Sequence, residues 1–291
     1  MFRLRSHQLT ALAIFALIVG VYTTLAVWFP VAYIWGTYED LVGEWGQTWL
    51  FALACGASVL AARRCRTRRW FFVVLATALF YTVMEEISWG QRIFGFESPD
   101  VFRRYNLQRE TNLHNILVGP FSTTTKDVIE YGLASALVLY GLFFPLALRW
   151  KLAPACWLDR HGVASPPLYL WPFFVTAGWL ETAPFHFNEA EIAELLVGFA
   201  LVVTPLHYWH AQARGVEPHP PPDWPGGAVR GMSVLILSVF GLAAALAVTS
   251  AWSFYQASGN RAGIENRLLN GYEKFAKRYD KYGRWDIVAR L

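Results

Sequence analysis

Two adjacent carboxylates, Glu85 and Glu86, begin a polar segment inside a stretch that is otherwise apolar enough to span a membrane. Ser88, Gln91 and Arg92 follow directly in the sequence. An ionisable group inside a transmembrane helix costs roughly 2.5 to 3.5 kcal/mol on insertion scales, so we expect such residues to serve a function. On a continuous helix Glu85, Ser88 and Arg92 would share one face, which predicts a polar stripe at least two turns long.

A second polar segment, residues 106–115, lies in the connection that follows and contains His114. Carboxylates and a histidine can hold a divalent metal ion that activates water, or can act as general acid and base. Ser88 and His114 could instead be nucleophile and base. The predicted catalytic residues are Glu85, Glu86, Ser88, His114 and Glu194; the predicted substrate-binding residues are Arg92, Gln91, Arg109 and Asn112; the candidate metal ligands are Glu85, Glu86 and His114. The alternative is that Glu85 or Glu86 forms a structural pair with Arg92.

The composition is that of an integral membrane protein. Of the 291 residues, 55% are hydrophobic and only 16% are charged, and the mean hydropathy is +0.30. A spanning helix needs about 20 mostly apolar residues, and such stretches lie near residues 9–30, 45–62, 70–90, 127–149, 166–187, 190–209 and 229–255. We therefore predict an all-α polytopic membrane bundle of about seven transmembrane helices. The first stretch is interpreted as a retained anchor, because it lacks a small-residue cleavage site.

The distribution of basic residues predicts the orientation. Five arginines follow the second stretch, whereas the loop after the first carries Glu39, Asp40 and Glu44 and no base. Since Lys and Arg are retained in the cytoplasm, we expect the amino terminus there and, with seven spans, the carboxyl terminus outside. The predicted division is a transmembrane bundle at residues 1–257, with a polar loop at 89–126, followed by an amphipathic tail at 258–291.

The tail has the pattern of an amphipathic helix. Apolar and aromatic residues recur at spacings of four and three between residues 264 and 282, with basic residues between them. Such a helix lies on a membrane or on a partner, so the expected partners are membrane lipids or a protein bound through the tail. With seven spans the tail lies outside, but a basic aromatic helix would sit equally well on the anionic cytoplasmic leaflet. The net charge of +4 and the pI near 9.0 are ordinary for basic cytoplasmic loops and do not indicate nucleic-acid binding.

Other polar residues have structural interpretations. Glu189 and Glu191 follow Asn188 in a pattern typical of a helix start, where acids favour the cap and the helix dipole. His207 and His210, at the inner end of the sixth stretch, lie among aromatic residues of the kind found at a membrane interface.

The strings EEISWGQRIFG and NLQRETNLHN, within residues 84 to 116, resemble a signature of a group of uncharacterised bacterial multi-pass inner-membrane proteins. The resemblance implies a bacterial inner membrane and brings no known activity. A looser likeness is to the seven-span membrane hydrolases related to alkaline ceramidases, which have the same helix count and similar acid, serine and histidine near a membrane surface. That superfamily uses a histidine pair on its last span. The last span here, 229–255, has no histidine or acid, so the likeness does not carry over that zinc site.

Two classes of function fit these residues. The first is a hydrolase or transferase acting on a lipid or lipid-linked substrate near the outer face, with a divalent metal ion as the candidate cofactor. The second is a non-catalytic membrane component, either an accessory subunit or a small-solute or proton-coupled carrier. A carrier needs a polar path toward the cytoplasm, and the third stretch has few polar residues below Glu85. No nucleotide-binding loop is present, which argues against ATP-driven and NAD-linked chemistry.

Overall fold

The computed structural model describes residues 5–106, 109–113, 123–215, 231–257 and 260–291, and this part of the chain contains helices and no strands. Five segments are long and apolar enough to cross a membrane: α1 (Ser6–Trp28), α2 with α3 (Pro30–Arg64), Asp127–Arg149, α12 (Ala190–Ala213) and α13 (Met232–Gln256). The bent pair Arg66–Glu86 and Ser88–Phe94 raises the number to six. The all-α prediction is confirmed for these residues, and five or six of the seven predicted spans meet the length and hydropathy criteria.

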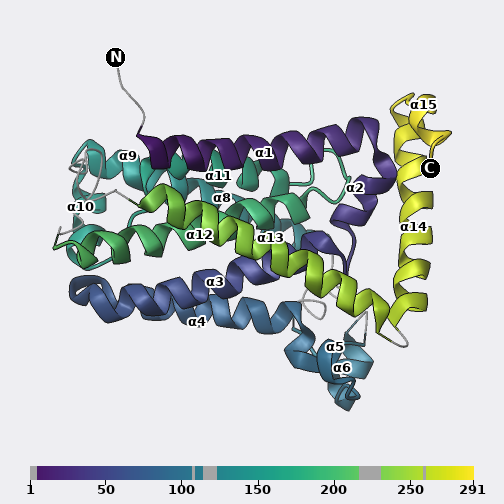
Figure 1. The fold of residues 1–291 in the computed structure, drawn as a ribbon, viewed down its shortest axis with the longest axis horizontal. Coiled ribbons are helices and arrows are strands. Elements are labelled where there is room, and N and C mark those ends of the chain that lie inside the picture. Colours follow the sequence, from purple (N-terminus) through teal and green to yellow (C-terminus); the bar gives the residue numbers. More distant parts are fainter. Residues whose placement is uncertain (1–4, 107–108, 114–122, 216–230, 258–259) are drawn as a thin grey trace.

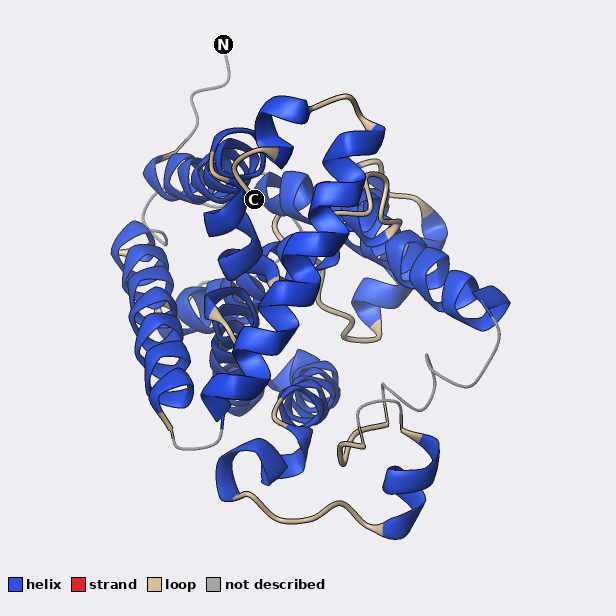
Figure 2. Cartoon of the chain, turned by 90° about the vertical axis from the view of Figure 1, so that its right-hand side faces the viewer, coloured by secondary structure: helices blue, strands red, loops and turns tan. Residues whose placement is uncertain are grey.

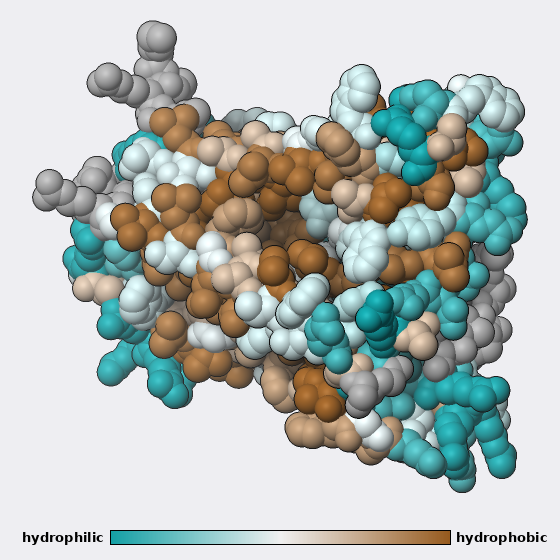
Figure 3. Space-filling view, turned by 45° about the vertical axis from the view of Figure 1, so that its right-hand side comes forward, coloured by the Kyte–Doolittle hydropathy of each residue, from teal (hydrophilic) through white to brown (hydrophobic). Residues whose placement is uncertain are grey.

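The long helices run side by side along one axis, and α12 lies among them (Figure 1). Within α12, 67% of the most apolar window is buried, against 17% in α1 and 22% in α13. The peripheral helices therefore expose apolar side chains along most of their length. In Figure 3 these form a broad hydrophobic band between two hydrophilic ends, which is the surface that a bilayer core would cover.

The predicted fifth span, 166–187, differs from the structure. Its helix α11 (Trp171–Glu181) has only 11 residues and follows the short turn η4 (Leu168–Leu170). At about 1.5 Å per residue α11 is roughly 17 Å long, too short for a bilayer core of about 30 Å. Phe173 and Phe174 are fully buried, whereas Trp171 and Trp179 are exposed, so this short helix packs one face into the bundle.

The backbone before α11 is extended and buried, and side chains from other segments satisfy it. Tyr208 Oη accepts a hydrogen bond from Ser165 N (3.1 Å) and donates one to Ser165 O (2.9 Å). Tyr140 Oη donates to Ala164 O, and Arg68 donates to Val163 O at 2.7 Å. Irregular backbone at membrane depth needs such partners.

The fourth predicted span consists of α8 (Thr123–Val138), a π-helical turn η3 (Leu139–Phe143) and α9 (Phe144–Arg149). Pro145 cannot donate a backbone hydrogen bond, which accounts for irregular helix at this point. Gly141 lies against Phe174, where an added Cβ atom would come within 2.1 Å of the ring. The close approach of η3 and α11 therefore requires glycine at this position. The short helix α10 (Ala153–Arg160) follows.

Helix α4 (Arg69–Glu86) ends at Glu86, and the chain then bends by 59° into η2 (Ser88–Gly90) and α5 (Gln91–Phe94). Ser88, Trp89 and Gly90 all have positive φ, at 48°, 54° and 86°. The prediction of one continuous helical stripe through Glu85, Ser88 and Arg92 is therefore wrong. Helix α6 (Asp100–Tyr105) follows in the polar loop.

Helix α14 (Asn260–Lys281) crosses the end of the bundle at which α1 ends, opposite the first described residues (Figures 1 and 2). We call this the α14 end. The amphipathic prediction is confirmed, since Ile264, Leu268 and Phe275 are buried and belong to the bundle core. Burial raises the pKa of Tyr279 to about 12, so its hydroxyl stays protonated near neutral pH and donates to Ala26 O at 2.6 Å.

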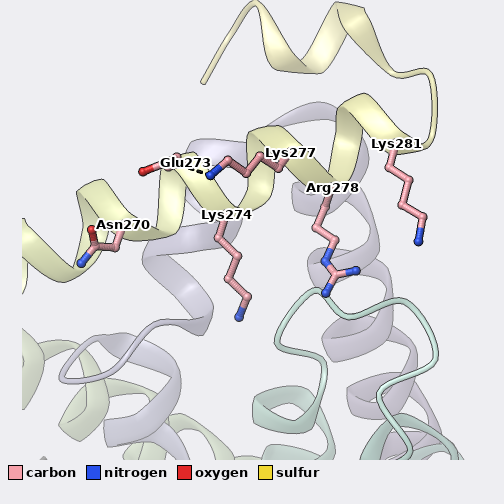
Figure 4. A pocket seen from close by; sticks show the side chains of 6 residues that line it. All are labelled: Asn270, Glu273, Lys274, Lys277, Arg278 and Lys281. Carbon is pink, nitrogen blue, oxygen red and sulfur yellow. Dashed lines mark hydrogen bonds and ion pairs between the residues drawn. The ribbon is translucent and has the colours of Figure 1, made fainter.

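The apolar face of α14 is thus covered by the protein's own bundle, and the basic face remains exposed. Figure 4 shows Lys274, Arg278 and Lys281 on one side of the helix, while Lys277 turns to Glu273 and forms an ion pair. A protein partner bound through the tail stays a prediction, and it would have to contact this basic face. A short helix, α15 (Trp285–Val288), ends the chain.

Candidate functional site

Four carboxylates from three helices approach one another at the α14 end. Glu44 lies at the start of α3 (Val42–Arg64), Glu86 at the end of α4, and Glu191 and Glu194 in the first turns of α12. The amide of Gln47, on α3, interacts with the carboxyl groups of Glu86 and Glu191. Glu194 interacts electrostatically with the other three. We call these four carboxylates and Gln47 the acidic cluster.

The acidic cluster contains buried oxygen atoms that have no hydrogen-bond partner. Within the described residues, Gln47 Oε1, Glu191 Oε2 and Glu194 Oε2 are buried and have no hydrogen-bond partner. A buried polar group without a partner costs about 1–3 kcal/mol, and three such atoms in one place are unusual for a purely structural site. These oxygens are therefore available to a proton or a ligand.

One arginine neutralises part of this charge. Arg92 Nη1 lies 2.5 Å from Glu44 and 3.1 Å from Asp40, and Nη2 lies 3.0 Å from Glu110. All four side chains are at most 21% exposed. Asp40 is also paired with Arg267 of α14. We call these five residues the Arg92 network, and it joins the α2–α3 connection, α5, the polar loop and α14.

The predicted anion-binding role of Arg92 has a physical obstacle. Both terminal nitrogens of its guanidinium already contact carboxylates, and its Nε is buried without a partner. An anionic substrate would have to displace these carboxylates. The alternative of a structural ion pair holds for Arg92 in this structure, but its partners are Asp40, Glu44 and Glu110 rather than Glu85 or Glu86.

Ser88 belongs to the scaffold beside the Arg92 network. Its hydroxyl donates to Glu110 Oε2 at 2.7 Å, and Asn112 donates to the same carboxylate oxygen at 3.1 Å. Asn106 in turn donates to Asn112 Oδ1 at 2.8 Å. Ser88 has no exposed surface. A nucleophile must reach its substrate, so this burial argues against the predicted catalytic role of Ser88, and the geometry gives Asn112 a part in fixing the loop.

Glu85 and Glu86 point to different neighbours, because each lies about 100° from the other around α4. Glu85 accepts hydrogen bonds from Trp89 Nε1 and from Leu113 N, both at 2.7 Å. It therefore fixes the polar loop against α4. Glu86 is the one that enters the acidic cluster, where Glu194 also lies.

Gln91 also fixes the loop, since its Oε1 accepts from Ser98 Oγ at 2.9 Å and from Thr111 N at 2.7 Å. The side chain of Arg109 is exposed, while its backbone has φ 59° and its carbonyl accepts from Ser98. Four of the predicted site residues therefore hold the polar loop in place through hydrogen bonds: Glu85, Ser88, Gln91 and Asn112.

The predicted metal site is not supported by the donor geometry. Within the described residues, no three His, Cys, Asp or Glu side chains are arranged to hold a metal ion. Glu85 and Glu86 have separate partners, as described above. His114, the third predicted ligand, lies outside the described residues.

A pocket of about 380 Å³ opens at the α14 end, beside the Arg92 network. Asp40, Gln91, Arg92, Glu110 and Arg267 contribute its charged and polar lining. Groups of both signs therefore face the same space. Such a lining suits a small polar or zwitterionic molecule better than an apolar one.

Sequence reasoning missed several of these residues. Glu44 and Gln47 lie three residues apart on α3, a spacing that could have indicated a shared polar face. In the sequence, Asp40 and Glu44 gave information only about the orientation in the membrane. Arg267, 227 residues from Asp40 in the sequence, gave no signal of its role.

Glu189 has a structural role, but it binds the loop before α12 and its side chain does not cap the helix as predicted. Its carboxylate accepts hydrogen bonds from the backbone N–H groups of Phe185, His186 and Phe187. Glu191, interpreted in the same way, belongs to the acidic cluster instead.

A second polar group lies at the opposite end of the bundle. His7 of α1 and His207 of α12 are 3% and 5% exposed, and their ring centroids lie 6.2 Å apart. Tyr169 Oη lies 3.4 Å from His207 Nδ1. The interpretation of His207 as an interfacial residue is therefore wrong, because the α1 and η4 segments bury it.

Comparison with protein-family models, curated proteins and solved structures finds no match to this chain. The arrangement of the residues themselves must therefore carry any assignment of function.

Proposed function

We propose that this chain is a multi-pass protein of the bacterial inner membrane, with its amino terminus in the cytoplasm and its α14 end outside. Five apolar helices of sufficient length support insertion. The five arginines between residues 63 and 69 lie at the end opposite α14, and the excess of Lys and Arg on cytoplasmic loops supports this orientation.

We further propose that the protein is a proton-coupled carrier of a small polar solute. The observation that carries this proposal is the acidic cluster, in which, among the described residues, Glu44 alone of the four carboxylates forms an ion pair, with Arg92. Unbalanced charge is expensive inside a protein or a bilayer. Protons are the simplest balance, since the described donors are not arranged around a metal ion. Buried acid and histidine chains are typical of proton relays in transporters.

The cytoplasmic half of α12 supports the same proposal. His207 lies 13 residues after Glu194 on this helix, or about 20 Å at 1.5 Å per residue. The helix therefore carries carboxylates near one surface and a buried histidine near the other. The third stretch has few polar residues below Glu85, and α12 adds Thr204 and His207 near the cytoplasmic end.

The pocket beside the Arg92 network is the proposed outer binding site for the solute. Glu44 links the two, because its carboxylate is a member of both the acidic cluster and the Arg92 network. A solute that competes for Arg92 would change the charge environment of Glu44. This shared residue is the proposed coupling element between solute binding and protonation.

The test is proton flux in proteoliposomes that contain an internal pH dye. A potassium gradient with valinomycin makes the interior negative, and a mixture of zwitterionic amino acids is added outside. We expect the wild-type protein to acidify the interior only when solute is present. Glu194→Gln and Glu86→Gln, which keep side-chain shape and remove the acid, should abolish the solute-dependent flux.

The matched control is Glu97→Gln, since that side chain is 89% exposed on the polar loop. It should transport as the wild type does. Undiminished flux in Glu194→Gln would overturn the assignment of the acidic cluster. Lack of flux with amino acids, with sugars and with small organic acids would refute carrier function.

An enzyme that acts on a lipid-linked substrate is the second candidate. It is favoured by the position of the pocket at a bundle end, where an anionic headgroup could enter and compete with Asp40 for Arg92 and Arg267. Incubation with lipid-linked phosphates and chromatographic analysis of the products tests it. Turnover that depends on Glu86 or His114 would favour this candidate over the carrier.

A further inference from the structure

A groove between α3 and α4, near the end opposite α14, has an apolar floor and a basic mouth. It has a volume of about 440 Å³ and lies between the carboxyl-terminal half of α3 and the first three turns of α4. Val59, Val73 and Phe80 line it and are 39%, 48% and 54% exposed. Arg63 and Arg69 line its mouth.

Small residues keep the groove open. Ala62 and Ala76 lie in its lining and are 6% and 8% exposed. Cys55 closes the floor between the two helices, because its Sγ donates to Ala76 O at 3.3 Å. Larger side chains at these positions would fill the groove.

The two arginines at the mouth differ from Arg64 and Arg68, which have partners within the protein. Arg68 is buried, pairs with Asp159 at 2.6 Å and donates to Val163 O, so it has a structural role. The Arg64 guanidinium lies over the Trp209 ring at 4.7 Å. Arg63 and Arg69 are exposed, and no carboxylate of the described residues pairs with them. Their charge is available to an external anion.

The length of the groove matches one leaflet of a bilayer. Phe80 lies 11 residues after Arg69 on α4, which corresponds to about 16 Å along the helix axis. Half of a bilayer core of about 30 Å is about 15 Å. An arginine pair binds phosphate oxygens well, and basic pockets between membrane helices on the cytoplasmic side suit anionic headgroups. A free phosphate ion would use the arginines but not the apolar floor.

We propose that this groove binds an anionic phospholipid of the cytoplasmic leaflet, with its phosphate on Arg63 and Arg69 and an acyl chain against Val59, Val73 and Phe80. This proposal rests on membrane insertion as proposed above and is independent of proton-coupled transport. It extends the general expectation of membrane lipids to a particular site and a particular lipid charge.

Native mass spectrometry of the full chain in mild detergent tests the site, with phosphatidylglycerol or phosphatidylcholine titrated in. We expect one phosphatidylglycerol to bind above the background and phosphatidylcholine to bind more weakly. Arg63→Gln/Arg69→Gln should weaken phosphatidylglycerol binding roughly 30-fold, from about 1 kcal/mol for each basic residue near an anionic lipid surface. Val73→Trp, which fills the groove and retains both arginines, should also displace the lipid.

The control is Arg278→Gln/Lys281→Gln, which removes the same charge on α14 at the other end of the bundle. It should leave phosphatidylglycerol binding at this site unchanged. Equal affinity in the wild type and the Arg63→Gln/Arg69→Gln variant, or no effect of Val73→Trp in a folded protein, would overturn the proposal. Each variant is compared at equal helical content by circular dichroism. Lipid binding by a wild-type protein that shows no solute-dependent proton flux would refute the carrier proposal alone.

Discussion

Arg92→Met is the sharpest perturbation of the structure, because it removes the guanidinium that pairs with Glu44 of the acidic cluster and retains most of the side-chain volume. Its side chain is 14% exposed, and those of Asp40, Glu44 and Glu110 are 7%, 11% and 21% exposed. Removing one partner of a buried ion pair costs about 3–5 kcal/mol. The buried Nε without a partner places the expected loss toward the lower part of that range.

The assay is the free energy of unfolding in mixed detergent micelles, followed by circular dichroism. We expect Arg92→Met to lower it by about 3 kcal/mol. Glu44→Gln in the Arg92→Met background should recover part of the loss, since it removes one of the carboxylates that the first substitution leaves unpaired. The double variant therefore separates a specific ion pair from general damage to the fold.

Arg103→Met is the matched control. Arg103 likewise contacts carboxylates, those of Glu97 and Asp100, but its side chain is 50% exposed and theirs are 89% and 74% exposed. Water screens such surface pairs, so no measurable loss of stability is expected. An Arg92→Met protein as stable as the control variant would refute the view that the Arg92 network holds the α14 end together.

Three further substitutions test the irregular segments on either side of α11 and its packing. Glu189→Gln replaces the carboxylate that accepts from the backbone N–H groups of residues 185–187, so the free energy of unfolding should fall by about 1–3 kcal/mol. Hydrogen exchange checks this, because amide exchange should become faster only in the 185–187 loop. Tyr208→Phe leaves both Ser165 backbone groups without their partner, so a loss of about 1–3 kcal/mol is expected in the same micelle assay, whereas an unchanged value would mean that water replaces the hydroxyl. Gly141→Leu inserts a side chain where Cβ would already meet Phe174, and the melting temperature should fall as overpacking costs about 1–3 kcal/mol or more; an unaltered melting temperature would show that η3 can move away.

Local sequence patterns were sufficient for most of the helices. Apolar stretches of about 20 residues predicted α1, α3, α12 and α13, because any such stretch satisfies its backbone only as a helix in an apolar environment. The same reasoning failed at α11, since hydropathy reports how apolar a segment is and not whether its backbone remains helical. Three prolines at 166, 167 and 172 favoured extended backbone and a late helix start there.

The amphipathic pattern determined that α14 would have one buried face, and the identity of the surface that covers it came from the tertiary structure. Gly271 shows the reason. A Cβ atom at this position would come within 2.7 Å of the Tyr38 ring, so the helix fits closely on the α2–α3 connection. The sequence pattern of α14 carries no information about the shape of that distant segment.

The candidate site was likewise predictable from the sequence only in part. The sequence by itself determined that Glu86, Glu194 and Arg92 are ionisable groups in apolar surroundings and need partners. Only the tertiary structure decided which partners they have, because the bend after Glu86 turns Arg92 away from its own helix and toward Asp40 and Glu44. Side-chain direction after a backbone bend depends on contacts between segments that are far apart in the chain, and helical spacing carries no information about those contacts.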